Sequence, residues 1–130
     1  MKYYNRRVQQ LNKEVFGKEY LTRYIIQGKK FIDANYADKI DLDKMAREAH
    51  LSKFHFVRLF KVNYGRTPHQ YLVEVRMKNA KELLKRGLPV SSVCVSVGFD
   101  SIPSFTRLFK KITGTTPARF QHVNQKSNFG

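Results

Sequence analysis

The 130-residue sequence is poor in cysteine, in acidic residues and in long apolar runs. Its one cysteine, Cys94, excludes an intrachain disulfide and any zinc cluster built on several cysteines. The longest uncharged stretch, residues 88–99, has 12 residues including three serines and is too short for a membrane span of about 20. Charges interrupt residues 1–20, so no signal-peptide core is predicted. We expect a cytoplasmic protein with no membrane partner.

Motifs typical of enzymes and metal sites are also missing. The sequence has no glycine-rich phosphate loop, nucleophile elbow or paired carboxylates. Its four histidines lack the i, i+4 spacing, with a carboxylate partner, that suits a metal site on a helix. We therefore expect no enzymatic activity, no metal and no cofactor.

The scarcity of acidic residues leaves a net charge of +15, from 25 basic and 10 acidic residues. The excess is uneven, because residues 51–130 hold 14 basic and only 3 acidic residues. A charge of this size attracts polyanions such as nucleic acid and says nothing about the fold. With 42% hydrophobic residues, the chain can form one ordinary domain or two small subdomains.

An internal repeat organises the chain. Eight positions recur 49 residues later: Arg-Leu-Phe-Lys at 58–61, Gly65, Thr67, Pro68 and Tyr71 in the first copy, and Arg-Leu-Phe-Lys at 107–110, Gly114, Thr116, Pro117 and Phe120 in the second. Upstream of residue 52 the offset falls to 48, so the second copy carries one extra residue in the turn between its first two helices. Each copy has the pattern helix, tight turn, helix, followed by a glycine and a Thr-Pro pair that opens the next helix.

Capping and turn residues locate the helix ends. Asp41 and Ser52 are N-cap types and predict helices that begin directly after them, while Gly65 predicts the end of the second of these helices. Gly98 and its counterpart His50 occupy the tight turns, where a positive φ is expected. We interpret His50 as a turn residue rather than a ligand or a base.

Two further helices complete the expected fold. Apolar residues between 21 and 32 predict an amphipathic helix that braces the first unit, with Gly28 allowing close packing. Residues 68–86 predict one long helix of roughly 28 Å between the copies. Residues 93–97 alternate as a strand would, but their counterpart in the first copy is helical. The predicted fold class is all-α, with two helix-turn-helix subdomains joined by a long linker helix and about seven helices in total.

The expected organisation has five segments. Residues 1–20 carry an apolar stripe (Tyr4, Val8, Leu11 and Val15) and are interpreted as a helical leader or an interdomain linker. The other segments are the first subdomain at 21–66, the linker helix at 67–87, the second subdomain at 88–124 and a tail at 125–130.

The second helix of a helix-turn-helix unit enters the major groove of DNA. In the first copy its outward face holds Lys53, Phe54, Val57, Arg58 and Lys61. Arg58 can bind guanine through two hydrogen bonds, Phe54 and Val57 can meet a thymine methyl, and the two lysines suit phosphate. In the alternative, Phe54 and Val57 belong to the core and the charges form a solvated face. The opposite face already supplies an apolar stripe, so exposure is favoured.

The corresponding surface of the second copy differs in chemistry. Its candidate DNA-binding residues are Ile102, Pro103, Ser104, Thr106, Arg107, Lys110 and Lys111. The backbone N–H groups at the start of this helix favour a phosphate. With fewer polar groups for base contacts, this helix is expected to add affinity more than sequence discrimination.

The length of the linker helix suggests how both copies bind. Roughly 28 Å is close to the ~34 Å between successive major grooves on one face of DNA. We therefore predict a site of two unequal half-sites about one helical turn apart.

The repeat resembles the AraC/XylS family of bacterial transcription regulators. The resemblance covers residues 21–122 and is carried by two groups of residues: 97–111 and 114–120 in the second copy, and Leu42, Met45, Ala46, Ser52, Phe60, Lys61, Gly65, Tyr71, Leu72, Arg76, Ala80, Leu83 and Leu84 in the first. The chain departs from the family pattern at Cys94, where Ala is preferred, at Gln121, where Arg is usual, and at Pro103, where a polar residue is more frequent.

The resemblance implies two helix-turn-helix subdomains that bind double-stranded promoter DNA and activate transcription through contact with RNA polymerase. It places Phe54, Val57 and Arg58 in the first recognition helix and Ile102, Pro103, Ser104 and Arg107 in the second, and it makes Arg76 structural. Many members carry a fused effector-binding or dimerising domain. The alternatives to a sequence-specific regulator are a non-specific or architectural nucleic-acid coat and a protein-binding adaptor that lost DNA affinity.

Overall fold

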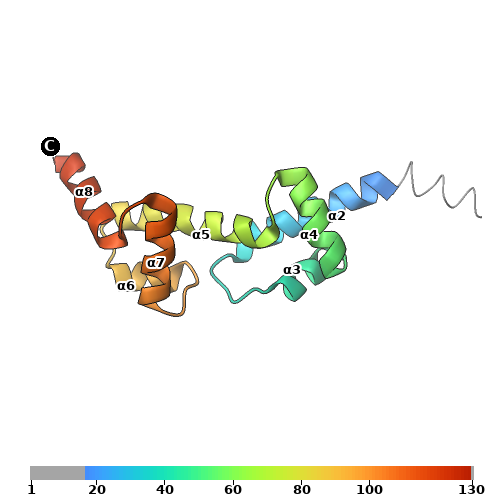
Figure 1. Ribbon diagram of the computed structural model, residues 1–130, viewed down its shortest axis with the longest axis horizontal. Coiled ribbons are helices and arrows are strands. Elements are labelled where there is room, and N and C mark those ends of the chain that lie inside the picture. The colour runs from blue at the N-terminus through green and yellow to red at the C-terminus, as the bar shows by residue number, and fades with distance from the viewer. Residues whose placement is uncertain (1–16, 130) are drawn as a thin grey trace, which may run out of the picture. The chain divides into compact units, whose positions relative to one another are not determined.

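The computed structural model describes residues 17–129, and the side chains of residues 20–125. The apolar stripe predicted for the leader lies outside the described residues. Within them the chain forms seven helices and no strand (Figure 1), which confirms the all-α prediction. The helices are α2 (Gly17–Asn35), α3 (Leu42–Glu48), α4 (Lys53–Tyr64), α5 (Pro68–Lys85), α6 (Val90–Ser96), α7 (Ile102–Thr113) and α8 (Pro117–Phe129).

The chain divides into two compact units. The first comprises the residues up to Ala34 together with Asp41–His69, and the second comprises Asn35–Ile40 and the residues from Gln70 onward. Each unit contains one copy of the repeat, with α3 and α4 in the first and α6 and α7 in the second. Nearly all of the long helix α5 lies in the second unit, together with the short segment Asn35–Ile40.

Two phenylalanines of α4 form the centre of the first unit. Phe56 and Phe60 are fully buried, and their ring centroids lie 5.6 Å apart. Gly28 of α2 permits this packing, because a Cβ atom there would lie 2.6 Å from Cε2 of Phe56 and 3.1 Å from Cβ of Ala49. The prediction that Gly28 allows close packing is confirmed.

The helix ends follow the predicted caps and turns. The side chains of Asp41 and Ser52 each accept a hydrogen bond from the backbone N–H three residues later, at 2.8 and 3.2 Å. Gly65 ends α4 with φ of 74°, and the two turn residues His50 and Gly98 have φ of 58° and 97°. These positions were identifiable because each depends on local chemistry.

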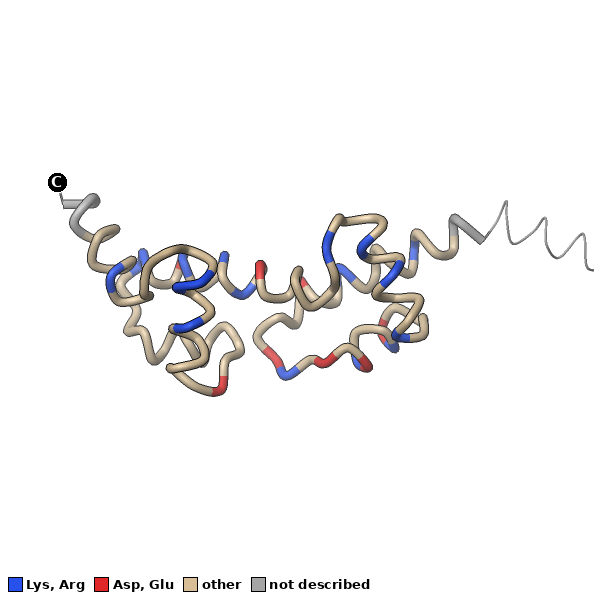
Figure 2. Tube along the Cα trace, viewed as in Figure 1, with Lys and Arg blue, Asp and Glu red and all other residues tan. Residues whose placement is uncertain are grey.

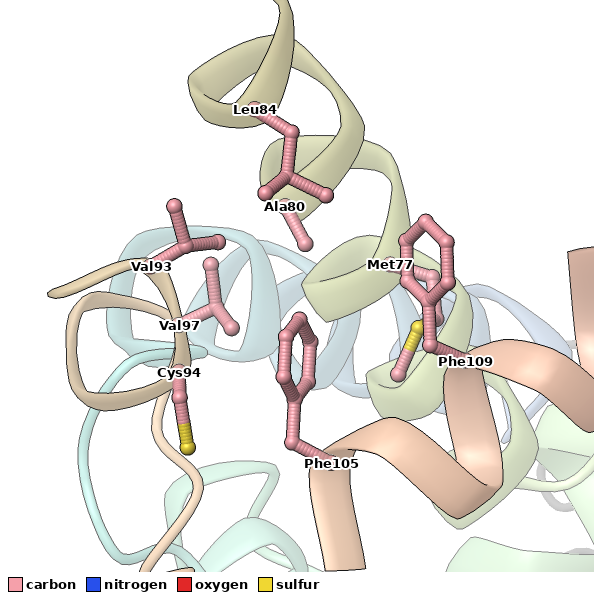
Figure 3. Packing of buried hydrophobic residues seen from close by; sticks show 8 residues of the cluster. All are labelled: Met77, Ala80, Leu84, Val93, Cys94, Val97, Phe105 and Phe109. Atoms are coloured by element: carbon pink, nitrogen blue, oxygen red, sulfur yellow. The ribbon is translucent and has the colours of Figure 1, made fainter. Parts of the chain in front are cut away.

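The core of the second unit is built from α5, α6, α7 and the residue that ends α6. Figure 3 shows its eight buried side chains converging: Met77, Ala80, Leu84, Val93, Cys94, Val97, Phe105 and Phe109. Residues 93–97 belong to α6 and its C-cap, so the helical interpretation of this stretch is confirmed. Burial raises the pKa of the Cys94 thiol, and the Asp100 carboxylate adds to the shift.

Gln121 closes the end of α5. Its side-chain amide donates hydrogen bonds to the backbone oxygens of Leu84, at 3.0 Å, and Leu88, at 2.6 Å. The Leu84 oxygen also accepts a hydrogen bond from the Gly87 N–H, at 3.0 Å, in the turn that ends α5, and Leu88 follows that turn. A glutamine thus satisfies two acceptors at the position where the family resemblance implies an arginine.

Arg76 holds the segment Asn35–Ile40 in the second unit. Its Nε donates to the backbone oxygen of Tyr36 at 2.7 Å and its Nη2 to that of Asp38 at 3.0 Å. The guanidinium also lies 5.6 Å from the ring centroid of Phe99. Burial lowers the pKa of Arg76, and the Asp100 carboxylate opposes that shift. All these contacts are internal, in agreement with a structural role.

Candidate nucleic-acid interface

The outward face of α4 is exposed, as a DNA-contacting face must be. Phe54 is 75% exposed, and Lys53, Arg58 and Lys61 are exposed as well. Val57 is half-buried. The alternative that places these two apolar residues in the core is therefore excluded for Phe54 and holds in part for Val57.

One of the predicted phosphate contacts has an acidic neighbour. Lys53 Nζ lies 3.1 Å from Oδ1 of Asp43, and both side chains are 58% exposed. Sequence reasoning missed this pair, because Asp43 belongs to the preceding helix and no spacing rule links the two positions. The ion pair keeps the ammonium group beside α3 and competes with a phosphate for it.

A shallow apolar hollow lies between α3 and α4. It has a volume of about 760 Å³ and is lined by Leu42, Ser52, Lys53, Phe54, Val57 and Arg58. Leu42, one of the residues that carry the family resemblance, is half-buried and forms part of this hollow. The predicted base-contacting residues of α4 thus share one concave surface with a residue of the first helix.

The corresponding face of α7 is also exposed. Pro103, Ser104, Arg107, Lys110 and Lys111 are exposed, and Ile102 is 46% exposed. Thr106 is half-buried, so its side chain is less available than predicted. The buried face of the same helix carries Phe105 and Phe109, which match Phe56 and Phe60 of α4.

The start of α7 offers few N–H groups to a phosphate. The Ser101 hydroxyl accepts a hydrogen bond from the Ser104 N–H at 3.2 Å, and Pro103 has no N–H. Of residues 102–104, at most Ile102 can donate its backbone N–H. The start of α7 therefore offers a phosphate fewer backbone hydrogen bonds than the helix dipole alone suggested.

Charge on the two recognition helices has one sign. Neither α4 nor α7 contains an acidic residue, and each carries three lysines and arginines (Figure 2). Surfaces of this kind attract the phosphate backbone of nucleic acid.

Searches for a metal-ligand cluster and for a membrane-spanning helix cover the described part of the chain. Between residues 17 and 129, no three His, Cys, Asp or Glu side chains are grouped so that they could hold a metal ion. None of the helices in this range combines the length and apolar character needed to cross a membrane.

Two helix-turn-helix units, each with an exposed basic second helix, define a DNA-binding domain. A family model described as a helix-turn-helix domain matches residues 45–122, which is more than half of the chain. The chain belongs to the AraC/XylS family of DNA-binding transcription regulators, and the resemblance recognised in the sequence is confirmed.

Curated transcription regulators are similar to this chain in sequence. The chain is 36% identical over 97 residues to the bifunctional transcriptional activator/DNA repair enzyme AdaA of Bacillus subtilis (strain 168), covering 74% of this chain and 46% of AdaA. It spans less than half the length of the first three curated relatives it matches.

Solved structures share the fold. The C-terminal domain of the two-component response regulator yesN from Fusobacterium nucleatum subsp. nucleatum ATCC 25586 has a TM-score of 0.70 at 29% identity, over 72% of this chain and 93% of that domain. The DNA-binding domain of AdpA, solved in complex with a target DNA, has a TM-score of 0.76 at 23% identity, over 79% and 94%. At 23% identity the latter likeness concerns the fold alone.

Proposed function

We propose that this chain is a sequence-specific transcription regulator that recognises two neighbouring major grooves with α4 and α7. The observation that carries the proposal is the same in both units. Each recognition helix buries two phenylalanines and turns an acid-free, basic face to solvent. A helix held by its buried side can enter a groove without losing the core of its unit.

The residues of the two faces take different roles. Arg58 contacts a guanine edge, Phe54 and Val57 contact a thymine methyl, and Lys53 and Lys61 bind phosphates. On α7, Arg107 contacts a base edge, and the other residues supply apolar and phosphate contacts: Ile102, Pro103, Ser104, Thr106, Lys110 and Lys111. The first helix then contributes most of the sequence preference.

Selection of bound duplexes from a random pool, followed by footprinting, tests the proposal. We expect two unequal half-sites about one turn apart, and a preference over random DNA of about 10³ or more at ordinary salt. Inserting five base pairs between the half-sites turns them to opposite faces of the duplex and should abolish tight binding. A preference near unity would instead identify a non-specific coat, and unchanged affinity after insertion would refute joint binding of two grooves.

Paired arginine variants test the division of roles. Arg58→Ala should relax the base preference more than Arg107→Ala does, with a loss of about 1–3 kcal/mol of discrimination at its base pair. Lys30→Ala, an exposed change on α2 outside both recognition helices, serves as the charge-matched control. A larger relaxation for Arg107→Ala would reverse the assignment.

Activation through RNA polymerase is the second part of the proposal. It is supported by the family and by the name of AdaA, a transcriptional activator. An effector-binding partner, fused or separate, is part of the same proposal and is supported by the family alone. Transcription in vitro from a promoter that contains the selected site should rise when the chain is added. A fall would identify a repressor.

A further inference from the structure

We propose that the hollow between α3 and α4 is a specificity site for the 5-methyl group of a pyrimidine, supplied by a thymine whose neighbouring base pair contains the guanine bound by Arg58. The inference rests on the proposed function and deepens it. It adds Leu42, a residue outside the recognition helix, to the residues that determine the sequence preference.

The floor of the hollow suits a methyl group. Leu42, Phe54 and Val57 contribute its apolar side chains. Phe54 is 75% exposed in the absence of DNA, while Leu42 and Val57 are half-buried and hold the floor in place. A pyrimidine 5-methyl is the apolar feature that a base pair presents in the major groove, beside oxygen and nitrogen acceptors.

The rim of the hollow explains why DNA is the occupant. Lys53 and Arg58 line its edge, and Ser52 adds a hydroxyl. An apolar floor beside a guanidinium matches the edge of a thymine next to a guanine, with phosphates beyond them. The apolar side chain of a protein partner would fill the floor but would offer no acceptor to the Arg58 guanidinium at its edge.

Helix geometry favours two neighbouring bases. Position 54 lies three residues from position 57 and four from position 58 on α4, which places its Cβ atom about 5–6 Å from theirs. Successive base pairs are separated by about 3.4 Å along the axis of the duplex. Arg58 and the apolar pair, which line one hollow, therefore reach adjacent base pairs rather than distant ones.

The test removes the methyl group alone. In the selected duplex, each thymine of the two half-sites is replaced in turn by deoxyuridine, and affinity is measured for the unmodified chain, Phe54→Ala, Leu42→Ala and Val62→Ala. Val62 is 76% exposed on α4 but does not line the hollow, so Val62→Ala is the matched control. Circular dichroism establishes that each variant is folded.

We expect one thymine, next to a guanine, at which deoxyuridine weakens binding about fourfold, the effect of burying one carbon. Phe54→Ala should bring the ratio of thymine to deoxyuridine affinity to about one, Leu42→Ala should lower it, and Val62→Ala should leave it unchanged. Replacing the same pair by 5-methylcytosine–guanine should bind more tightly than cytosine–guanine, because the methyl group is shared.

The outcomes separate this inference from the function on which it rests. If the chain prefers its selected site but no thymine shows the deoxyuridine effect, the hollow does not bind a methyl group and the regulator proposal stands. A deoxyuridine effect that persists in Phe54→Ala, or that falls on a thymine without a neighbouring guanine, overturns the inference as well. If no duplex is preferred over random DNA, the proposed function fails first.

Discussion

Replacing Gly28 by alanine should weaken the first unit, although alanine is the better helix former. A Cβ at residue 28 would lie 2.6 Å from Cε2 of Phe56, against an optimal carbon separation of about 3.5–4.0 Å. Phe56 cannot turn away easily, because it is fully buried and its ring contacts that of Phe60. Overpacking of this kind costs about 1–3 kcal/mol, and we take the upper half of that range.

The net effect follows from two opposing contributions. Alanine gains about 1 kcal/mol over glycine in the interior of a helix. The expected loss in the free energy of unfolding of the first unit is therefore about 1–2 kcal/mol for Gly28→Ala. Gln27→Ala and Gln27→Gly, at the exposed neighbouring position, measure the helix-propensity contribution without the clash.

A double-mutant cycle isolates the clash. Phe56→Leu removes the ring atoms that the new methyl group would meet, while the 3.1 Å contact with Cβ of Ala49 remains. In that background Gly28→Ala should therefore cost less than it does in the native chain. Urea denaturation followed by far-ultraviolet circular dichroism, with hydrogen exchange of the α2 and α4 amides, provides the measurement. The reasoning is refuted if Gly28→Ala is stabilising by itself, or if its cost is unchanged in the Phe56→Leu background.

Three further predictions concern other contacts. Asp43→Asn should free Lys53 for phosphate and raise the affinity for random DNA and for the selected site by about the same factor, because a phosphate contact does not depend on sequence. Direct binding titrations on both duplexes measure this, and a gain confined to the selected site would argue against a phosphate contact by Lys53. Gln121→Ala should lower the free energy of unfolding by about 1–3 kcal/mol, because the Leu88 carbonyl loses the donor that Gln121 supplies, while the Leu84 carbonyl keeps the Gly87 N–H. Urea denaturation that detects no loss would contradict this. The pKa of Cys94 is raised on folding, so its contribution to stability is complete below the usual thiol value of about 8.5 and is lost as pH rises through the folded value. Urea midpoints should therefore fall more steeply with alkaline pH for the native chain than for Cys94→Ala, and parallel curves would exclude the effect.

Much of the fold was predictable because it depends on local chemistry. Ser52 caps α4, Gly65 ends it and His50 adopts a positive φ, and each of these outcomes is set by a residue and its immediate neighbours. The exposure of the α4 face followed from the two-sided pattern of a helix, since one apolar stripe already filled the core.

What the sequence did not predict depends on how helices are placed side by side. The pairing of Lys53 with Asp43 and the position of Leu42 beside α4 arise across the turn, where no fixed periodicity relates the two helices. The half-buried state of Val57 and Thr106 has the same origin, because depth at the edge of a packed face depends on the neighbouring helix.

The contacts of Arg76 have a consequence for dividing this chain. Arg76 binds the carbonyls of two residues that lie between α2 and α3. The second unit thus includes a short segment whose neighbours in the sequence belong to the first unit. A fragment that begins at Gln70 would keep its apolar centre yet leave a guanidinium without its two acceptors. The two units are therefore not separable by one cut in the chain, although their sequences are similar. Any single cut leaves at least one unit without part of its residues.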